Sequence, residues 1–292
     1  MRDGPEKPAM PPAVSPSRDW RRERPELFFW TWSRLVILGL LAGIGGYVFL
    51  WGLGVLGFGI DRLVNGSLRL GQAIGLMFPP TAQGQLPLYI HAIGETLAMA
   101  FLGTLVAAIL SVPLGLMGAR NIMPVGPVRL LVRRSSDVVR GLDALIWAIF
   151  FVSVVGLGPF AGILAIAVND TAILTKLTAE ALENTDREQQ RGVRATGAGR
   201  LSVINFGVLP QVFPVLIGNA LYFFESNVRS ASILGIVGAG GIGFYLMDRM
   251  MLSAWREVSV IVGLILVAVA CIDFLSGRLR RRFIAGRGAR VQ

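Results

Sequence analysis

The chain has 292 residues, of which 53% are hydrophobic and 16% are charged, whereas about 25% of residues are charged in typical soluble domains. So much apolar surface cannot be buried in one soluble core, which excludes an ordinary soluble enzyme and indicates an integral membrane protein. The net charge of +10 comes from Lys and Arg at the ends of apolar runs. That pattern is typical of membrane flanks rather than of nucleic-acid binding, and the single Cys271 excludes a disulfide framework.

Residues 1–30 are rich in proline and arginine and poor in apolar side chains. We expect them to form a disordered cytoplasmic tail. The first apolar run begins near Leu35, after this polar tail, and is too long for a cleavable signal peptide. Residues 31–87 are therefore expected to hold a retained first transmembrane helix and an extracytoplasmic segment.

Uncharged runs predict about six transmembrane helices, so the expected fold is an all-α membrane protein with a core at residues 88–276. The stretch Gly156-Leu157-Gly158-Pro159 is typical of a tight turn and separates the third helix from the fourth. The sixth run needs flanking residues to cross about 30 Å of hydrocarbon. In chain order the predicted ranges are Leu35–Asp61, Thr96–Gly118 (entered from about Leu88), Asp137–Val155, Pro159–Ala179, Leu201–Phe224 and Val258–Ile272.

Basic residues predict the orientation. With an inside N-terminus and six crossings, segments 1–34, 119–140, 176–206 and 277–292 lie inside and hold 23 of the 28 Lys and Arg. The remaining five lie in the outside segments, which predicts that both termini are cytoplasmic and that 277–292 is a basic cytoplasmic tail. A seventh crossing at Ser230–Met247 would place that tail outside. We therefore expect this glycine-rich segment to dip into the membrane and return, or to lie within the bundle.

The same segment contains G-x-G-x-x-G at Gly238, Gly240 and Gly243, with Gly241 between them. A dinucleotide-binding loop needs a βαβ unit, and no alternating strand and helix pattern surrounds these glycines. In a membrane bundle such glycines more often permit close helix approach or a bend beside a water-filled path. We interpret the four as candidates for gating or close packing.

Residues 180–210 form a polar segment between two apolar runs on the positively charged side. Asn184-Thr185-Asp186 offers a helix cap, a helix is expected over Arg187–Ala195, and Leu201–Phe206 could begin another. Gly197 and Gly199 would end the first of these helices. Two short helices joined at an angle would form a knob on the cytoplasmic face.

Three stretches of the sequence, "RATGAGRLSVINFGVLPQVFP", "ALYFFESNVRSASILGIVGAGGIG" and "GLGPFAGILAIAV", strongly resemble the permease subunit of bacterial ABC importers, in particular the phosphonate-type permeases. The resemblance covers about Leu88–Phe274. It implies the type I ABC importer permease fold and a coupling loop at 180–210. It also implies import, by alternating access, of phosphonate or a related oxyanion such as phosphite or phosphate.

In that family the cytoplasmic loop carries E-A-A-x3-G-x9-I-x-L-P. Anchored on Leu209-Pro210, its glycine falls on Gly197 and its Ile on Gly207, while E-A-A falls on Arg191-Gly192-Val193. An arginine therefore replaces the acidic residue, and Glu188 could supply a nearby carboxylate. The residues that the resemblance assigns to coupling with the ATPase are Arg191, Gly192, Arg194, Ala195, Gly197, Leu209 and Pro210.

Polar side chains within the apolar runs predict a substrate pathway, because such groups are costly in hydrocarbon unless they have a partner or line water. Glu225 and Arg229 are four apart and could form one ion pair, either as a structural latch or as a substrate contact. His91 and Glu95 share a helix face in the same way, as a polar pair rather than a metal site. The candidates for the pathway are Asn169, Asp170, Asn219, Glu225, Asn227 and Arg229.

The resemblance implies several partners: a second permease copy in a homodimer or a paralogous heterodimer, two ATP-binding cassette subunits that hold ATP and Mg, and an extracytoplasmic phosphonate-binding protein. The chain itself is expected to hold no cofactor, metal or catalytic residue, to bind no nucleic acid, and to lie in the bacterial inner membrane. Three alternatives stay open at this point. They are an ABC permease for a sulfonate or an amino acid, a secondary transporter driven by an ion gradient, and an intramembrane enzyme.

Overall fold

The computed structural model describes residues 32–57 and 59–288, without the side chains of 33, 34 and 280–288. The predicted tail at residues 1–30 and the last four residues of the chain lie outside this description. All secondary structure in the described part is helical. In chain order it comprises α2 (Trp32–Val55), α3 (Ile60–Leu76), α4 (Leu86–Gly118), α5 (Gly126–Arg140), α6 (Ala144–Val155), α7 (Pro159–Glu183), α8 (Arg187–Ala195), α9 (Arg200–Val203), η2 (Ile204–Val208), α10 (Leu209–Leu234), η3 (Gly235–Ala239), α11 (Gly241–Met251) and α12 (Trp255–Gly288).

Two compact units make up the chain, Met1–Leu70 and Gly71–Gln292. The first contains α2, whose 24 residues reach about 36 Å, enough to cross the hydrocarbon core. Leu35–Val55 is apolar throughout and none of it is buried, as expected of a helix that faces lipid. The sequence pattern did not predict α3. Its polar side chains, among them Arg62 and Arg69, lie on one side, and Leu63 and Leu70 lie on the other.

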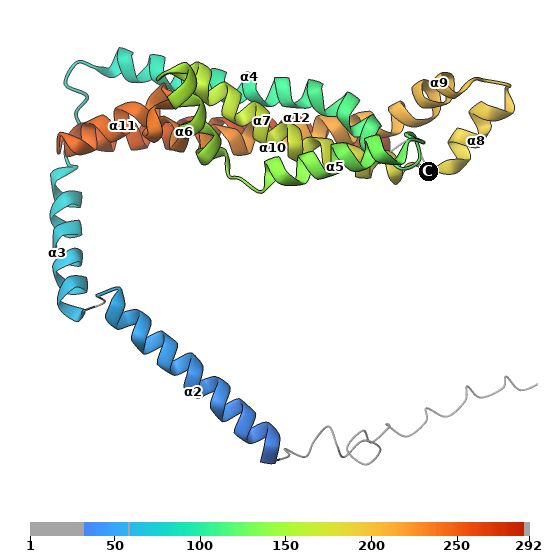
Figure 1. Cartoon of the computed structure of the whole chain (residues 1–292). Coiled ribbons are helices and arrows are strands. Elements are labelled where there is room, and N and C mark those ends of the chain that lie inside the picture. The colour runs from blue at the N-terminus through green and yellow to red at the C-terminus, as the bar shows by residue number, and fades with distance from the viewer. Residues whose placement is uncertain (1–31, 58, 289–292) are drawn as a thin grey trace, which may run out of the picture. The chain divides into compact units, whose positions relative to one another are not determined.

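The second unit is a bundle of long helices, α4, α7, α10 and α12, with shorter helices at both ends (Figure 1). Helices α4 and α7 are closely packed because small residues lie where they meet. A Cβ added at Gly103 would be 2.7 Å from Cβ of Ile166, and one added at Gly115 would be 2.5 Å from Cγ2 of Thr178. Small residues at helix contacts are the usual basis of packing in membranes.

The third predicted helix, Asp137–Val155, is wrong as a single element. Helix α5 ends at Arg140, α6 begins at Ala144, and the two are bent by 87°. Two sequence features explain the break. Helix α5 is amphipathic and carries four arginines, whereas α6 is uniformly apolar. Asp143 caps α6 by accepting a hydrogen bond from the backbone N–H of Leu145 at 2.9 Å.

The turn predicted at Gly156-Leu157-Gly158-Pro159 is confirmed. Gly156 and Gly158 have φ angles of 101° and 138°, which favour glycine, and Pro159 begins α7. The fourth and sixth predicted spans correspond to α7 and α12, which extend beyond the predicted ranges. The second predicted span is α4, which begins at Leu86 and runs through Pro113 without ending.

The fifth predicted span ended at Phe224, and this end is wrong. Helix α10 continues for ten more residues, to Leu234, so Glu225 and Arg229 lie inside the helix rather than in a link after it. Within this extension Arg229 pairs with Asp273 of α12, as described below. The glycine-rich segment follows as η3 and α11, packed against α4, α10 and α12.

Five described helices are long and apolar enough to cross a membrane, or six if the bent pair α5–α6 counts as one span. Helix α11, with 11 residues, is not among them. This agrees with six crossings and with a glycine-rich segment that lies within the bundle. The start of α5, the pair α8–α9 and the end of α12 lie at one end of the bundle, and α11 and the α6–α7 turn lie at the other (Figure 1).

Candidate functional site

The polar segment after α7 protrudes beyond the ends of the long helices as a pair of short helices, α8 and α9 (Figure 1). Helix α8 begins as the sequence predicts, with the Asp186 side chain accepting a hydrogen bond from the backbone N–H of Glu188 at 2.9 Å. Arg191, Gly192, Arg194 and Ala195 lie on this helix and are exposed. The chain re-enters the bundle through α9 and the π-helical turn η2, which leads directly into α10.

Gly197 makes the turn between the two short helices. Its φ angle is 78°, in the region that favours glycine, and its N–H donates to the carbonyl of Arg194 at 3.0 Å. Nothing lies within 4 Å of where a Cβ would be, so the backbone conformation alone calls for glycine. Leu209 and Pro210 begin α10, where a missing N–H is tolerated.

Hydrogen bonds fasten both ends of the protruding segment to α10. The Gln211 side chain accepts from the backbone N–H of Asp186 at 3.0 Å and donates to the carbonyl of Gly207 at 2.6 Å. The Gln190 amide donates to the Thr185 hydroxyl at 2.8 Å. Since Gln211 contacts the chain both before and after α8, movement of that helix must also move the first turn of α10.

A second group of contacts joins the segment to α4, α5 and α7. Glu183, the last residue of α7, accepts from the Arg133 guanidinium at 2.5 Å and from the backbone N–H of Arg120 at 2.6 Å. The Asn121 amide donates to the carbonyl of Leu182 at 2.7 Å, and the Arg200 guanidinium donates to the carbonyl of Ile122. The turn after α4, the middle of α5 and the end of α7 are thus tied together near the start of α8.

Beside α8 lies an open polar cavity of about 300 Å³. Arg187, Arg191 and Arg194 line it on α8, together with Asn121, Glu183, Thr185 and Gln190. The sequence pattern pointed to Arg191 and Arg194 but not to Arg187, and the contribution of Asn121 depends on a segment far away in the chain. A concave surface with three arginines is suited to carboxylates presented by another protein.

Within the bundle, three of the predicted pathway residues form a polar cluster. Asp170 on α7 is 2% exposed and accepts a hydrogen bond from the Asn227 amide of α10. That amide also donates to the Thr104 hydroxyl of α4 at 2.8 Å, and the Asn169 amide lies 3.4 Å from the Asp170 carboxylate. Asp170 and Asn227 therefore join α4, α7 and α10 inside the protomer. Asn219 lies on α10, partly buried and two turns from this cluster.

Arg229 forms an ion pair with Asp273 of α12 at 3.0 Å, and its other terminal nitrogen lies 3.9 Å from Glu225. The Glu225–Arg229 pair expected from the spacing is present, and the sequence did not predict the additional pairing of Arg229 with Asp273. Arg229 lies inside the span Arg200–Ala239, at least about 15 Å along the axis from either end. The side chains of Arg229 and Asp273 are 46% and 41% exposed. Charged groups exposed along a membrane-spanning helix need water or another protein surface beside them.

The glycine-rich turn packs against α4 and α7. Gly238 and Gly240 have φ angles of 97° and 78°, and the carbonyl of Gly238 accepts from the N–H of Gly158 at 3.0 Å. A Cβ at Gly240 would be 2.8 Å from Cδ of Pro159, while one at Gly241 would overlap Thr96 and one at Gly243 the backbone of Ser232. The glycines thus permit close backbone approach, at the place where the sequence suggested it.

Two side chains of α4 hold the first turn of α11. Glu95 accepts from the N–H of Gly241 at 3.3 Å, and the Thr96 hydroxyl accepts from the N–H of Ile242 at 2.9 Å. These contacts satisfy backbone donors at a helix start, which would otherwise be unpaired inside the protein. Glu95 also pairs with His91 at 3.5 Å, as the spacing predicts.

A buried polar network at the same end was not predicted. Glu257 of α12 is 3% exposed, accepts from the Tyr89 hydroxyl and lies 3.3 Å from Nε of Arg249. Arg249 donates in turn to the Gln85 side chain at 2.9 Å. In the sequence Glu257 lies next to an apolar run, as many exposed residues at helix ends do. Its burial could therefore not be predicted from the sequence.

The arrangement defines a class of protein: a helical membrane subunit with a protruding helix pair tied to its long helices. Its fold matches a solved chain of the MetNI methionine ABC transporter, described as inward facing, with a TM-score of 0.60. The match covers 70% of this chain and 99% of that chain at 23% identity. At that identity the likeness concerns the fold alone, which is that of the type I ABC importer permeases.

The sequence identifies the family. Residues 111–285 match the family model described as binding-protein-dependent transport system inner membrane component, and the chain belongs to this family. It is therefore a multi-pass protein of the bacterial inner membrane and the permease subunit of an ABC importer, not itself an enzyme.

Two named transport proteins are similar to this chain. The phosphite transport system permease protein PtxC of Stutzerimonas stutzeri is 36% identical over 248 residues, which cover 84% of this chain and 89% of that protein. The phosphate-import permease protein PhnE of Mycolicibacterium smegmatis (strain ATCC 700084 / mc(2)155) is 38% identical over 208 residues, which cover 71% of this chain and 39% of that protein.

Proposed function

We propose that this permease imports a phosphorus oxyanion, namely phosphonate, phosphite or phosphate. The observation that carries the proposal is the similarity to PtxC, a phosphite transport permease, along most of both chains. The similarity to PhnE, a phosphate-import permease, supports the same class of substrate. A separate extracytoplasmic binding protein would deliver the anion, and separate ATPase subunits would hold ATP and Mg.

The proposed orientation has both termini in the cytoplasm, with α8 and α9 on the same side. It is supported by the basic residues, since 23 of 28 lie in segments on that side. Cysteine labelling tests it, with Cys271 replaced by alanine. Ala195→Cys on α8 should react only from the cytoplasmic side, and Leu252→Cys after α11 only from outside. The reverse pattern would contradict the orientation.

We assign α8 as the coupling helix, which docks on the ATPase. The residues proposed to form or position this contact are Arg191, Gly192, Arg194, Ala195, Gly197, Leu209 and Pro210. In this permease the docking face is cationic, with Arg187, Arg191 and Arg194 around one cavity. Its partner surface on the ATPase should therefore carry carboxylates. Closure of two ATPases on ATP would move α8 as a lever.

The contacts around α8 supply a path for that movement. Gln211 links both ends of the loop to α10, and Glu183 links it to α4, α5 and α7. A rigid, hydrogen-bonded junction transmits displacement, whereas a flexible link would absorb it. Alternating access would follow from movement of these helices in two permease copies, in a homodimer or in a heterodimer with a paralogue.

The proposed anion pathway passes the α10–α12 surface at Arg229. A half-exposed guanidinium at membrane depth suits an oxyanion, which it can bind through two parallel hydrogen bonds. Arg229 forms ion pairs with Asp273 and Glu225, and competition from these carboxylates would keep its contact with an anion weak enough for passage. Two permease copies would bring two such arginines to the shared pathway. Asn169, Asp170, Asn219 and Asn227 would support or line it, and the glycines 238, 240, 241 and 243 would allow the outer gate to move.

The substrate is tested by the ATPase activity of the reconstituted complex. The permease and its ATPase are placed in nanodiscs, and the binding protein is added with phosphite, methylphosphonate, phosphate, methanesulfonate or methionine. Stimulation by one or more of the phosphorus oxyanions, and not by the sulfonate or methionine, is the expected result. Stimulation by methanesulfonate or methionine alone would contradict the proposal and favour a permease for another small solute.

A further inference from the structure

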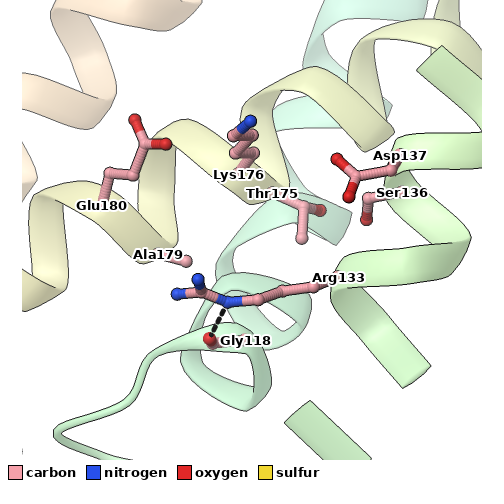
Figure 2. Close-up of a pocket in the computed structure, with 8 residues that line it drawn as sticks. All are labelled: Gly118, Arg133, Ser136, Asp137, Thr175, Lys176, Ala179 and Glu180. Carbon is pink, nitrogen blue, oxygen red and sulfur yellow. Dashed lines mark hydrogen bonds between the residues drawn. The ribbon is translucent and has the colours of Figure 1, made fainter. Parts of the chain in front are cut away.

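A cavity of about 120 Å³ lies between α5 and α7, at the end of the bundle that carries α8 (Figure 1), and of its lining residues only Arg133 belongs to the Glu183 junction described above. The end of α4 closes one side of it. Figure 2 shows the side chains around it, which are those of Arg133, Ser136, Asp137, Thr175, Lys176, Ala179 and Glu180, together with Gly118.

The hydroxyl of Thr175 is the first sign of a ligand. Thr175 is 2% exposed, and its Oγ1 has no hydrogen-bond partner within the described part of the chain. In Figure 2 this oxygen points toward Ser136 and Asp137, across the cavity. Leaving such a buried group unpaired costs about 1–3 kcal/mol. A hydroxyl that faces a cavity therefore favours an occupant that can hydrogen-bond to it.

Two cations, Arg133 and Lys176, and two carboxylates, Asp137 and Glu180, line the cavity, and Glu180 is exposed to solvent. Two of the three guanidinium nitrogens of Arg133 donate hydrogen bonds. Nε donates to the carbonyl of Gly118 at 2.9 Å, and one terminal nitrogen donates to the Glu183 carboxylate. Lys176 is exposed at the rim. The carboxylate of Asp137 lies between two arginines of its own helix, Arg134 at 3.8 Å and Arg140 at 3.5 Å, which offset its charge.

The cavity is large enough for an occupant of more than one heavy atom. One water molecule takes about 30 Å³ in the liquid, so 120 Å³ exceeds what a single bridging water fills. A tetrahedral oxyanion would fit. Its oxygens could accept from the hydroxyls of Thr175 and Ser136, from the Lys176 ammonium and from the remaining Arg133 nitrogen. Hydroxyl and guanidinium donors are the usual partners of phosphate groups in proteins.

We propose that the α5–α7 cavity is a binding site for a phosphate or phosphonate group, separate from the transport pathway. The group has two possible sources of the same chemistry. One is a free oxyanion on the cytoplasmic side, and the other is the headgroup of an anionic phospholipid in the adjacent leaflet. Because the site joins α5 to α7 beside the Glu183 junction, its occupant would brace these helices where α8 is attached.

The test uses the complex of permease and ATPase with ADP saturating the nucleotide sites. In one arm the complex is placed in phosphatidylcholine nanodiscs and binding of radiolabelled orthophosphate is measured by equilibrium dialysis. In the other arm the complex is purified from phosphatidylglycerol-containing membranes, and retained phosphatidylglycerol is counted by native mass spectrometry. The variants are Thr175→Val, which keeps the side-chain shape, and Lys176→Gln, which changes an exposed residue.

Thr171→Val is the matched control, because Thr171 is another α7 threonine whose buried hydroxyl has no partner in the described structure but does not line this cavity. At least fivefold loss of phosphate binding in Thr175→Val and Lys176→Gln, with Thr171→Val unchanged, supports the site with a free anion as occupant. The same loss confined to retained phosphatidylglycerol supports the site with a lipid headgroup. Binding of neither ligand, or equal loss in all three variants, overturns the proposal.

Discussion

Replacing Gly197 by alanine tests how the coupling helix is held. Gly197 has a φ angle of 78° between α8 and α9, and there is open space where a Cβ would lie. Alanine therefore meets no neighbour, and its whole effect comes from the backbone conformation. A left-handed conformation costs a non-glycine residue about 1–2 kcal/mol. Gly197→Ala should thus disfavour the turn without disturbing the bundle.

That cost translates into a measurable loss of coupling. Since 1.4 kcal/mol corresponds to a factor of ten in an equilibrium, about 1–2 kcal/mol lowers the population of the observed turn by roughly 5- to 30-fold relative to its alternatives. If α8 must hold this geometry to dock, ATPase activity stimulated by the loaded binding protein should fall by a similar factor. Thermal stability of the permease should change little, because the turn lies outside the core.

Two variants make the comparison specific. Gly199→Ala changes a neighbouring glycine with an ordinary φ angle of −66° and open space around it, so it should leave stimulated ATPase activity unchanged. Gly197→Asn should recover part of the activity, because asparagine tolerates the left-handed conformation better than alanine. Equal activity of Gly197→Ala and Gly199→Ala in nanodiscs would refute the role given to the turn.

Three further variants probe the contacts behind α8 and inside the bundle. Glu183→Gln weakens the junction of α4, α5 and α7, so the melting temperature of the complex should fall by an amount equivalent to about 1–2 kcal/mol, and stimulated ATPase activity should fall with it. Asn227→Leu leaves the buried carboxylate of Asp170 with only the longer hydrogen bond from the Asn169 amide, which should destabilise the permease by about 1–3 kcal/mol in thermal unfolding; adding Asp170→Asn should reduce the loss. Arg229→Gln should lower phosphite uptake into proteoliposomes at least tenfold, with Arg229→Lys intermediate because lysine lacks the paired donors of arginine.

For each of these variants, one result would contradict the prediction. Glu188→Gln, an exposed change on α8, serves as the control for Glu183→Gln. Equal melting temperatures of the two variants would show that the Glu183 contacts do not stabilise the complex. If the Asn227→Leu protein were as stable as the unmodified permease, other groups would have to stabilise the buried Asp170 carboxylate. Full phosphite uptake by Arg229→Gln would place the anion pathway elsewhere.

Local signals explain what the sequence predicted correctly. Long uncharged runs mark α4, α7 and α12, and glycines before a proline mark the turn at 156–159. The cap at Asp186 and the turn at Gly197 follow from the preferences of single residues. Such features depend on neighbours within a few positions, which a sequence displays.

The errors arose where distant residues decide the structure. Helix α10 passes through Glu225 and Arg229 because Asp273, on another helix, neutralises the arginine. The buried Glu257 depends in the same way on Tyr89, which lies at the start of α4. The bend between α5 and α6 was missed because a hydropathy window merges an amphipathic helix with the apolar helix that follows it. The amphipathic periodicity of α5 and the cap at Asp143 were present in the sequence and could have separated them.

Uptake of radiolabelled phosphite into proteoliposomes distinguishes an ATP-driven importer from other transporters. The vesicles contain the permease and its ATPase, ATP is enclosed on the side of α8, and the loaded binding protein is added on the opposite side. Uptake should require both enclosed ATP and the binding protein, and a proton gradient should not replace either. Uptake that persists without ATP, or that a proton gradient alone sustains, would contradict a permease moved through α8.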